Sequence, residues 1–315
     1  MKSISVAMTT YNGEKFLNQQ LQSIAAQSRQ IDELVVCDDG SVDGTIDILN
    51  DFVKKVSFNV KLLKNEKNLG CTKNFEKAMS LCTGDIIVLC DQDDLWLPKK
   101  IKVLENVFSE NPDCGMVFTD AEVFDEENQF LYYLWQSVGF TARRQKLFKR
   151  NMGTRLLLKR NVATGATAAV TKTFFEEALP FPEETIHDYW LAMIAVLKNK
   201  LVFLKEATIK YRKHSAQQIG CGRNVAFEAD FNFDKTVKLY KALKEGLESK
   251  KLLNRQYSEM LADKIDFFMF RRDLSRNRIK RICPILFNMF QGNYSRHSSG
   301  LLSAAKDFLG LRKKK

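Results

Sequence analysis

Residues 86–94 read IIVLCDQDD, an unbroken apolar run that ends at three carboxylates within four residues. Apolar runs without polar alternation are typical of parallel strands that helices cover on both faces. Similar runs alternate with helical patterns through the first 120 residues, at 4–8, 34–37, 60–63 and 116–119. These repeated strand and helix units predict an α/β fold with a Rossmann-like, open and mostly parallel sheet flanked by helices.

Composition and pattern divide the chain into two parts. The 315 residues are 45% hydrophobic and 28% charged, which excludes disordered, collagen-like and low-complexity proteins. From about residue 233 the sequence reads as consecutive helices without a strand signal. We therefore expect an α/β domain over residues 1–232 and a basic helical C-terminal extension over residues 233–315.

Nearly all of the net charge of +11 lies near the C-terminus, because residues 251–315 contain 15 Lys and Arg against 5 Asp and Glu. Apolar residues recur there at helical spacing over 279–290 and 301–309, and the chain ends in Arg312-Lys313-Lys314-Lys315. Basic amphipathic segments are typical of proteins that lie on an anionic membrane surface. Alternatively, these helices pack on the body and the lysines are a solvated end. Nucleic acid is not an expected partner, because no recognition motif accompanies the charge.

Two further features bear on location. No apolar run approaches the roughly 20 residues that a bilayer span requires, and a polar turn follows the first strand too early for a signal peptide. We therefore expect a cytoplasmic protein that is peripheral on the inner face of the cell membrane. The seven cysteines are dispersed and form no CxxC pair, which indicates reduced thiols rather than disulfides or a zinc site.

The acidic cluster at Asp91, Asp93 and Asp94 is the strongest chemical signal. Three adjacent carboxylates raise one another's pKa unless a cation neutralises them. Oxygen ligands favour Mg²⁺ or Mn²⁺, and both ions commonly complete their coordination with substrate phosphates. The alternative is an exposed acidic turn that caps the helix beginning near Pro98.

Polar clusters also follow two other predicted strands, at residues 9–13 and 38–45. Ligands of open α/β sheets bind beyond the carboxyl ends of the strands, so these clusters and the acidic one form a candidate site. Asp43 or Thr45 could cap the next helix. Because the pair of acids at Asp38 and Asp39 exceeds what a cap needs, a binding role is also open.

Three histidines occur in the chain. His187 and Asp188 begin an apolar helical run, which would present the Asp188 carboxylate at a helix N-terminus, as a base or a cap. Taken alone, His214 could be a metal ligand, a phosphate contact or a surface residue. His297 lies in the basic tail, and we expect it to be a surface residue.

Seven segments in chain order resemble the inverting nucleotide-sugar glycosyltransferases of family 2, which have a GT-A fold. Within that family, the segments DQDDLW, HDYWL and YRKH are most similar to bacterial rhamnosyltransferases that use dTDP-L-rhamnose. The resemblance covers about residues 1–225. The seven segments lie at 9–28, 35–45, 68–79, 90–101, 163–170, 187–192 and 211–220.

The resemblance implies a role for each matching residue. Asp188 matches the catalytic base, and His187 stands beside it where the family often has Glu or Asp. A Mn²⁺ or Mg²⁺ ion that bridges the donor diphosphate would be held by Asp93, Asp94 and His214. The residues implied in binding the nucleotide sugar are Thr9, Tyr11, Asn12, Asp38, Asp39, Lys73, Asp91, Gln92, Thr164 and Gly165.

The implied function is inverting, metal-dependent transfer of a hexose to a saccharide acceptor of a bacterial cell-surface polysaccharide. L-Rhamnose from dTDP-L-rhamnose is the first candidate donor, and a UDP-hexose is the alternative. The acceptor is expected to be lipid-linked, which would give a membrane-binding tail a purpose. A nucleotide-binding membrane scaffold is the non-enzymatic alternative. A haloacid-dehalogenase-type phosphatase and an HD-type phosphohydrolase fit less well, because the residues around Asp93 and His187 lack their patterns.

Overall fold

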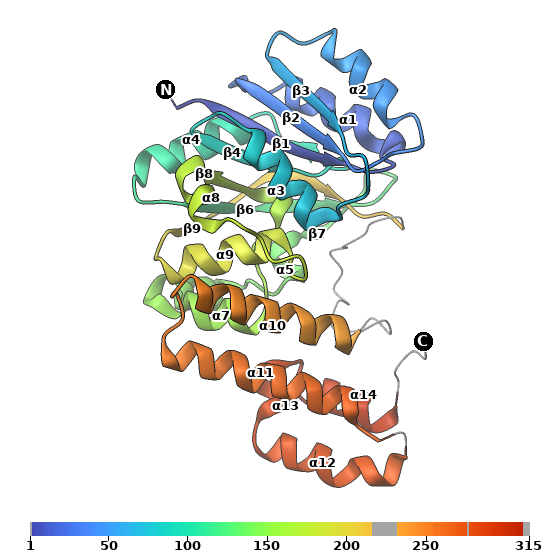
Figure 1. Ribbon diagram of the computed structural model, residues 1–315, viewed down its shortest axis with the longest axis vertical. Coiled ribbons are helices and arrows are strands. Elements are labelled where there is room, and N and C mark those ends of the chain that lie inside the picture. The colour runs from blue at the N-terminus through green and yellow to red at the C-terminus, as the bar shows by residue number, and fades with distance from the viewer. Residues whose placement is uncertain (1, 216–231, 276, 311–315) are drawn as a thin grey trace.

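The computed structural model describes residues 2–215, 232–275 and 277–310 (Figure 1). These residues form one sheet of nine strands in the order β3-β2-β1-β4-β8-β6-β9-β5, with β7 paired to β6. Three features of the sequence lie outside the described residues: Cys221, residues 216–220 of the last matching segment, and the basic end at 311–315. The strands are β1 (Ile4–Thr10), β2 (Glu33–Asp38), β3 (Asn59–Lys64), β4 (Ile86–Cys90), β5 (Leu95–Trp96), β6 (Met116–Phe124), β7 (Phe130–Tyr133), β8 (Ala168–Thr171) and β9 (Leu201–Arg212).

Four strands form the predicted parallel part of the sheet. β1 pairs in parallel with β2 on one side and with β4 on the other, and β3 extends the sheet beyond β2. Nearly every residue of β1, β2 and β4 is buried, as expected of strands that helices cover on both faces. The carboxyl ends of these strands therefore meet at one edge of the sheet.

The other part of the sheet is mixed. β8 runs antiparallel to both β4 and β6, whereas β6 pairs in parallel with β9. Between β7 and β8 the chain forms a series of short helical segments. These segments are α5 (Leu134–Ser137), α6 (Ala142–Leu147), a π-helical turn (Phe148–Met152), α7 (Gly153–Lys159) and a 3₁₀ turn (Gly165–Thr167).

Helices cover both faces of the sheet. Side chains alternate along a strand, so Val6 and Ala7 of β1 belong to two different apolar cores. The helices over the Val6 face are α1 (Glu14–Ala25), α2 (Thr45–Val53) and α4 (Lys100–Glu110), and those over the Ala7 face are α3 (Cys71–Leu81), α7, α8 (Lys172–Ala178) and α9 (His187–Leu197).

The first helices of the C-terminal extension share the core of the α/β domain. α10 (Phe233–Ser249) and α11 (Arg255–Asp273) contribute Leu243, Leu247 and Leu261 to the same core as α9. In Figure 1 α10 lies below α9 at the level of α7, and α11 lies below α10. The first half of the extension, which precedes the two amphipathic segments, is therefore packed on the body.

The last helices form a smaller layer farther from the sheet (Figure 1). They are α12 (Arg278–Phe290), α13 (Asn293–His297) and α14 (Leu301–Leu309). A buried ion pair joins α11 to α14, because Arg271 Nε lies 2.7 Å from Asp307 Oδ2, to which the Tyr294 hydroxyl donates at 2.8 Å. Among the described residues, no helix is long and apolar enough to cross a bilayer. The six described cysteines are free, as predicted.

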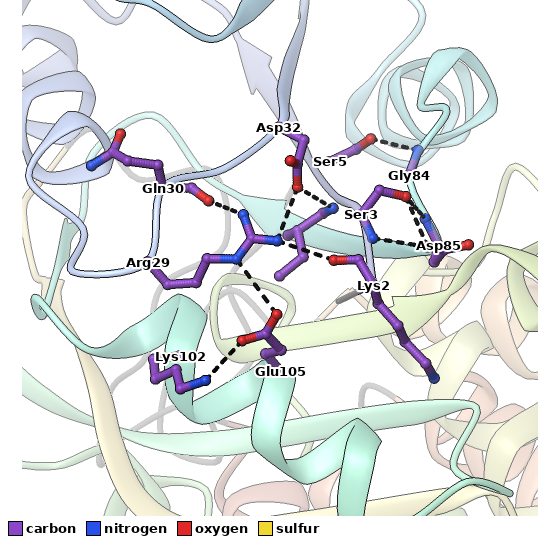
Figure 2. A network of polar contacts seen from close by, with 11 residues as sticks. Lys2, Ser3, Ser5, Arg29, Gln30, Asp32, Gly84, Asp85, Lys102 and Glu105 are labelled. Atoms are coloured by element: carbon purple, nitrogen blue, oxygen red, sulfur yellow. Dashed lines mark hydrogen bonds and ion pairs between the residues drawn. The ribbon is translucent and has the colours of Figure 1, made fainter.

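The amino-terminal edge of the sheet is closed by a polar network (Figure 2). Arg29, just after α1, lies 3.1 Å from Asp32 and 3.5 Å from Glu105 of α4, and it donates to the Lys2 carbonyl at 3.0 Å. Asp85, just before β4, accepts from the backbone and hydroxyl of Ser3 at 2.8 Å. These contacts join the starts of β1 and β4 to α4. They occupy the edge opposite to the one that the polar clusters follow.

Candidate active site

A cavity of about 1330 Å³ opens at the carboxyl ends of β1, β2 and β4. Asp39 and Asp91 line it at the strand ends, and Thr164 and Asp188 line it from the segments beneath. The cavity continues to the C-terminal extension, where Lys264 of α11 is part of its wall. One space therefore joins the predicted nucleotide site to helices that were expected to be separate from it.

The loop after β1 is held to the acidic segment by one side chain. Gln92 accepts from the Tyr11 backbone N–H at 2.9 Å and donates to the Tyr11 carbonyl at 3.1 Å. A side chain at Gly13 would collide with it, because a Cβ there would lie 2.3 Å from Gln92 Oε1. Thr9, Tyr11, Asn12 and Gln92 all line the cavity, where the sequence predicts the nucleotide sugar.

The two acids of the loop after β2 have different positions. Asp39 lines the cavity, and its carboxylate accepts from the backbone N–H groups of Leu69 and Gly70 at 2.8 and 2.9 Å. Asp38 is fully buried and does not belong to the cavity wall. Its carboxylate accepts from Thr10 Oγ1 and from the Ser41 backbone, both at 2.8 Å, so Asp38 shapes the loop rather than facing a ligand.

Lys73 is also outside the cavity wall. It lies in the first turn of α3, and its ammonium group forms an ion pair with Glu76 of the same helix at 2.8 Å. Glu76 in turn accepts from the Phe181 backbone at 2.8 Å. Lys73, which was predicted to contact the nucleotide sugar, therefore pairs with a residue of its own helix instead.

Three carboxylates face the cavity together, and we call Asp91, Asp93 and Asp188 the acidic end. Burial, together with the smaller effect of the charges of Asp93 and Asp188, raises the pKa of Asp91 to about 7. A buried cation lies close to them: Lys100 donates to the Ala166 carbonyl at 2.6 Å, and burial lowers its pKa to about 8. Sequence analysis missed Lys100, whose signal was a lysine on the apolar face of a helix.

The predicted metal ligands are brought together in part. His214 Nε2 lies 2.9 Å from Asp93 Oδ2, and both residues line the cavity. Asp94 departs from the prediction, because it is buried outside the wall and its carboxylate accepts from the Arg212 backbone at 3.0 Å. Across residues 2–215, 232–275 and 277–310, no three His, Cys, Asp or Glu residues are arranged to hold a metal ion. The oxygen and nitrogen donors of Asp93 and His214 still suit Mn²⁺ or Mg²⁺.

Asp188 stands at the N-terminus of α9, as predicted, and both of its carboxylate oxygens are held. Oδ1 accepts from Asn161 Nδ2 at 3.0 Å, and Oδ2 accepts from the Gly165 backbone N–H at 2.9 Å. Burial raises the pKa of Asp188 to about 6, although these two hydrogen bonds act in the opposite direction. The result is a fixed carboxylate that accepts a proton more readily than an ordinary aspartate.

His187 differs from its neighbour, because it is a neutral part of the cavity floor. Its ring is buried and stacks on Phe75 with centroids 4.0 Å apart, and burial lowers its pKa to about 3. A Cβ at Gly165 would lie 2.6 Å from His187 Nε2, so this glycine is required for close packing. His187 therefore adds no charge beside Asp188.

Arg212 is a second residue that sequence analysis missed, although it lies within a matching segment. Its Nε donates to the Asp93 carbonyl at 2.9 Å, and its guanidinium group sits 4.6 Å from the ring centres of both Phe16 and Phe124. Arg212 is buried at the end of β9. It fixes the backbone that carries Asp93, which explains how Asp93 and His214 come to face each other.

The family model for glycosyl transferase family 2 matches residues 5–178, which hold the loops after β1, β2 and β4. The chain belongs to glycosyl transferase family 2. The match ends before α9, so Asp188 and His214 lie beyond it.

Curated relatives of this family 2 chain agree with the predicted enzyme class. The dTDP-rhamnosyl transferase RfbG of Shigella flexneri is 28% identical over 238 residues, which are 71% of this chain and 76% of the relative. EpsE of Bacillus subtilis, which is named as a glycosyltransferase, is 34% identical over 123 residues, or 39% of this chain. The chain matches less than half of EpsE, because the alignment covers 44% of it.

Solved structures confirm the predicted GT-A fold. Residues 1–349 of TarS from S. aureus, solved with UDP-GlcNAc, superpose with a TM-score of 0.60 at 18% identity, covering 98% of this chain and 79% of that one. The mannosyltransferase PcManGT from Pyrobaculum calidifontis, solved with GDP-Man and Mn²⁺, gives a TM-score of 0.52 at 16% identity, covering 98% and 87%.

Proposed function

We propose that this family 2 chain transfers a hexose from a nucleotide diphosphate sugar to a hydroxyl group of a saccharide, with inversion at the anomeric carbon. The observation that carries the proposal is the fixed, proton-accepting carboxylate of Asp188 in the same cavity as Asp91, Asp93 and His214. A base and a diphosphate site must both face the sugar if one displacement is to join acceptor and donor.

Asp188 acts as the general base. It removes the proton of the acceptor hydroxyl as that oxygen attacks the anomeric carbon from the face opposite to the leaving diphosphate. A general base works best when its pKa approaches the working pH, and burial moves the pKa of Asp188 to about 6, toward that range. Asn161 and Gly165 keep its two oxygens in place, so no side-chain rearrangement is needed to orient the base.

Asp93 and His214 would hold the divalent ion that the family implies. A bound Mn²⁺ or Mg²⁺ supplies positive charge that stabilises the leaving diphosphate. The fit rests on the donors themselves, since an oxygen and a ring nitrogen lie 2.9 Å apart beside a second carboxylate, Asp91. Asp94 is not part of this proposal, because the Arg212 backbone occupies its carboxylate.

The donor that we propose first is dTDP-L-rhamnose. Its support is the Shigella relative named as a dTDP-rhamnosyl transferase, which aligns beyond the matched family segment to 71% of this chain. Tyr11 and Asn12 on one side and Asp39 on the other would contact the base and ribose. A UDP-hexose remains the alternative donor, because a single methyl or hydroxyl group in the pocket can decide between sugars.

The acceptor that we propose is a lipid-linked saccharide, reached at the inner face of the cell membrane. Large apolar side chains of the last helices are exposed: Ile279 and Phe290 of α12 by 77% and 89%, and Leu301 of α14 by 75%. α12 also carries a positive charge at Lys280, next to Ile279 in the sequence. Exposed apolar groups beside cations suit the headgroup region of an anionic bilayer.

Calorimetric titration with dTDP, UDP, GDP and CDP, each with and without Mn²⁺, tests the proposal. The expected result is binding of dTDP that is strengthened by Mn²⁺ and exceeds that of the other nucleotides. Preference for UDP would move the donor to a UDP-hexose. If a nucleotide binds but no nucleotide sugar is turned over with any saccharide acceptor, the scaffold alternative would replace the enzyme.

A further inference from the structure

The part of the cavity wall beneath the sheet is positively charged. Arg144 of α6, Lys159 and Arg160 at the end of α7, and Lys264 of α11 all line it, and we call these four residues the basic wall. Within the described residues, none of the four forms an ion pair with a carboxylate. Their hydrogen bonds go to main-chain carbonyls instead, such as Arg160 to Val138 at 3.2 Å and Lys159 to Ser295 at 2.7 Å.

The four cations converge although they come from three separate segments. A Cβ at Gly139 would lie 2.6 Å from Arg144 Nη1 and 3.0 Å from Arg160 Nη1, so both guanidinium groups approach one point. Lys264 Nζ donates to the carbonyl of Lys159 at 3.0 Å, which places it beside the end of α7. In agreement, partial burial and the charges of Arg144, Arg160 and Lys264 all lower the pKa of Lys159.

Two members of this region are buried without the partners that buried polar groups normally have. Lys264 is 2% exposed, and the described contacts of its ammonium group are main-chain carbonyls and the rings of Tyr240 and Phe268, 4.2 and 6.0 Å away, with no carboxylate among them. His297 was expected at the surface, but it is 7% exposed, lines the cavity and leaves Nε2 without a hydrogen bond among the described residues. Buried lysines are rarely found without an acidic partner, and an unpaired buried donor costs free energy.

The basic wall begins beside the proposed base and lies away from the nucleotide loops. Arg160 directly precedes Asn161, whose side chain holds Asp188. In Figure 1, α7 and α11 lie below the sheet. The strands β1 and β2, which are followed by the loops that carry Tyr11 and Asp39, lie in the upper part of the sheet. A donor whose diphosphate sits at Asp93 and His214 therefore leaves the wall free, on the side from which an acceptor must reach Asp188.

We propose that the basic wall binds the phosphate or diphosphate group of the acceptor. This inference rests on the proposed function and names the acceptor class as an anionic, phosphate-bearing saccharide. Guanidinium forks match pairs of phosphate oxygens, and lysine adds compact charge. Hydroxyl groups at Ser298 and Ser299 line the same region and can donate to further oxygens. The bound group would pair the charges of Arg144, Arg160 and Lys264, which lack a carboxylate partner.

The test replaces two guanidinium groups and measures binding rather than turnover. The double variant Arg144→Gln with Arg160→Gln is titrated with geranyl diphosphate, which represents a lipid-linked acceptor, and with a short glycerol phosphate oligomer, which represents a polymer acceptor. Each titration is run without nucleotide and with saturating dTDP and Mn²⁺. The matched control is Arg143→Gln with Arg150→Gln, because both residues are exposed, lie outside the wall and carry the same charge.

The expected result is at least tenfold weaker binding of one phosphate probe by the double variant, with the control and the dTDP affinity unchanged. The stronger of the two probes identifies the source of the phosphate. Equal probe affinity in the double variant and the wild type would overturn the proposal, and so would a parallel loss of dTDP affinity, which would assign the wall to the donor. If the double variant fails to fold, Arg144→Gln alone is used.

The titration without nucleotide separates this inference from the proposed function. Wild-type binding of a phosphate probe with no binding of any nucleotide would retain the wall and remove the transferase. Nucleotide binding and turnover with no phosphate probe bound would retain the transferase and remove the wall.

Discussion

The two ends of the cavity have opposite charge and different construction. The acidic end brings together Asp91 and Asp93, which directly follow one buried strand, and Asp188, which lies at the start of one helix. The basic wall gathers Arg144, Arg160 and Lys264 from three segments that only the tertiary fold brings together. From this difference we propose that the sheet edge binds the donor and that the helices beneath it bind the acceptor.

The largest expected effect follows from removing the base at the acidic end. Asp188→Asn keeps the shape of the side chain, but an amide cannot accept the proton of the acceptor hydroxyl. We expect kcat to fall by about 10²–10⁴-fold, the usual contribution of general base catalysis. Steady-state kinetics measures the fall in kcat, and calorimetry measures the affinity for the nucleotide.

Nucleotide affinity close to that of the wild type is the accompanying result. An Asp188→Asn enzyme that kept more than about a third of its kcat would show that another group accepts the proton.

The next largest effect concerns the metal ligands. Asp93→Ala removes the oxygen donor beside His214, so the Mn²⁺-dependent part of nucleotide binding should disappear and activity should fall by more than about tenfold. Calorimetry with and without Mn²⁺ checks this. Asp94→Ala is the matched comparison, because its carboxylate serves the Arg212 backbone. We expect Asp94→Ala to lower the stability of the fold and to leave the Mn²⁺ dependence of nucleotide binding unchanged. The reverse pattern would show that Asp94 is a metal ligand.

These two acids also illustrate what sequence can predict. Asp93 and Asp94 are neighbours in one motif, so pattern alone treats them alike, yet one lines the cavity and the other supports β9. Asp38 and Lys73 were likewise placed at the ligand, whereas their groups bond to Thr10 and Glu76. The side chains of Asp38 and Asp94 are directed by hydrogen bonds to distant segments, which no spacing reveals, whereas Lys73 pairs with Glu76 three residues along the same helix.

The fold shows the same limit. The parallel strands were predictable because β1, β2 and β4 are apolar throughout and buried on both faces. In the mixed part, the start of β6 was predicted from the run at 116–119, whereas β8 with four residues and β5 with two are too short for a periodic signal. The basic wall and buried His297 were equally hidden, because their surroundings come from distant segments.

A moderate decrease in kcat is expected when the pH is lowered from 7 to 5. The base works only when ionised, and the raised pKa of Asp188, about 6, places its protonation just below neutrality. As pH falls from 7 to 5 the ionised fraction should drop from about nine-tenths to about one-tenth, so kcat should fall by roughly tenfold. A pH profile of kcat at saturating substrates measures it. The residual activity of Asp188→Asn should not show this fall in kcat between pH 7 and pH 5. An identical fall in the variant would show that another group is responsible for the pH dependence.

The smallest expected effect lies farthest from the chemistry. Phe290→Glu places a charge on the most exposed apolar side chain of α12 and should weaken sedimentation with anionic vesicles severalfold, because one membrane contact is lost and one repulsion is gained. Turnover with a soluble acceptor should not change. The control is Phe130→Glu on β7, which is also exposed but remote from the last helices. Equal vesicle binding by both variants and the wild type would remove α12 from the membrane contact.

The measurement that tests the central claim most directly is the anomeric configuration of the product. The claim is that a single displacement, with Asp188 as the base, joins acceptor and donor in this cavity. Proton NMR of the transferred sugar, made from the nucleotide sugar that calorimetry selects, should show a configuration opposite to that of the donor. Retention would contradict the account, because it requires two displacements through a covalent or equivalent intermediate instead of one.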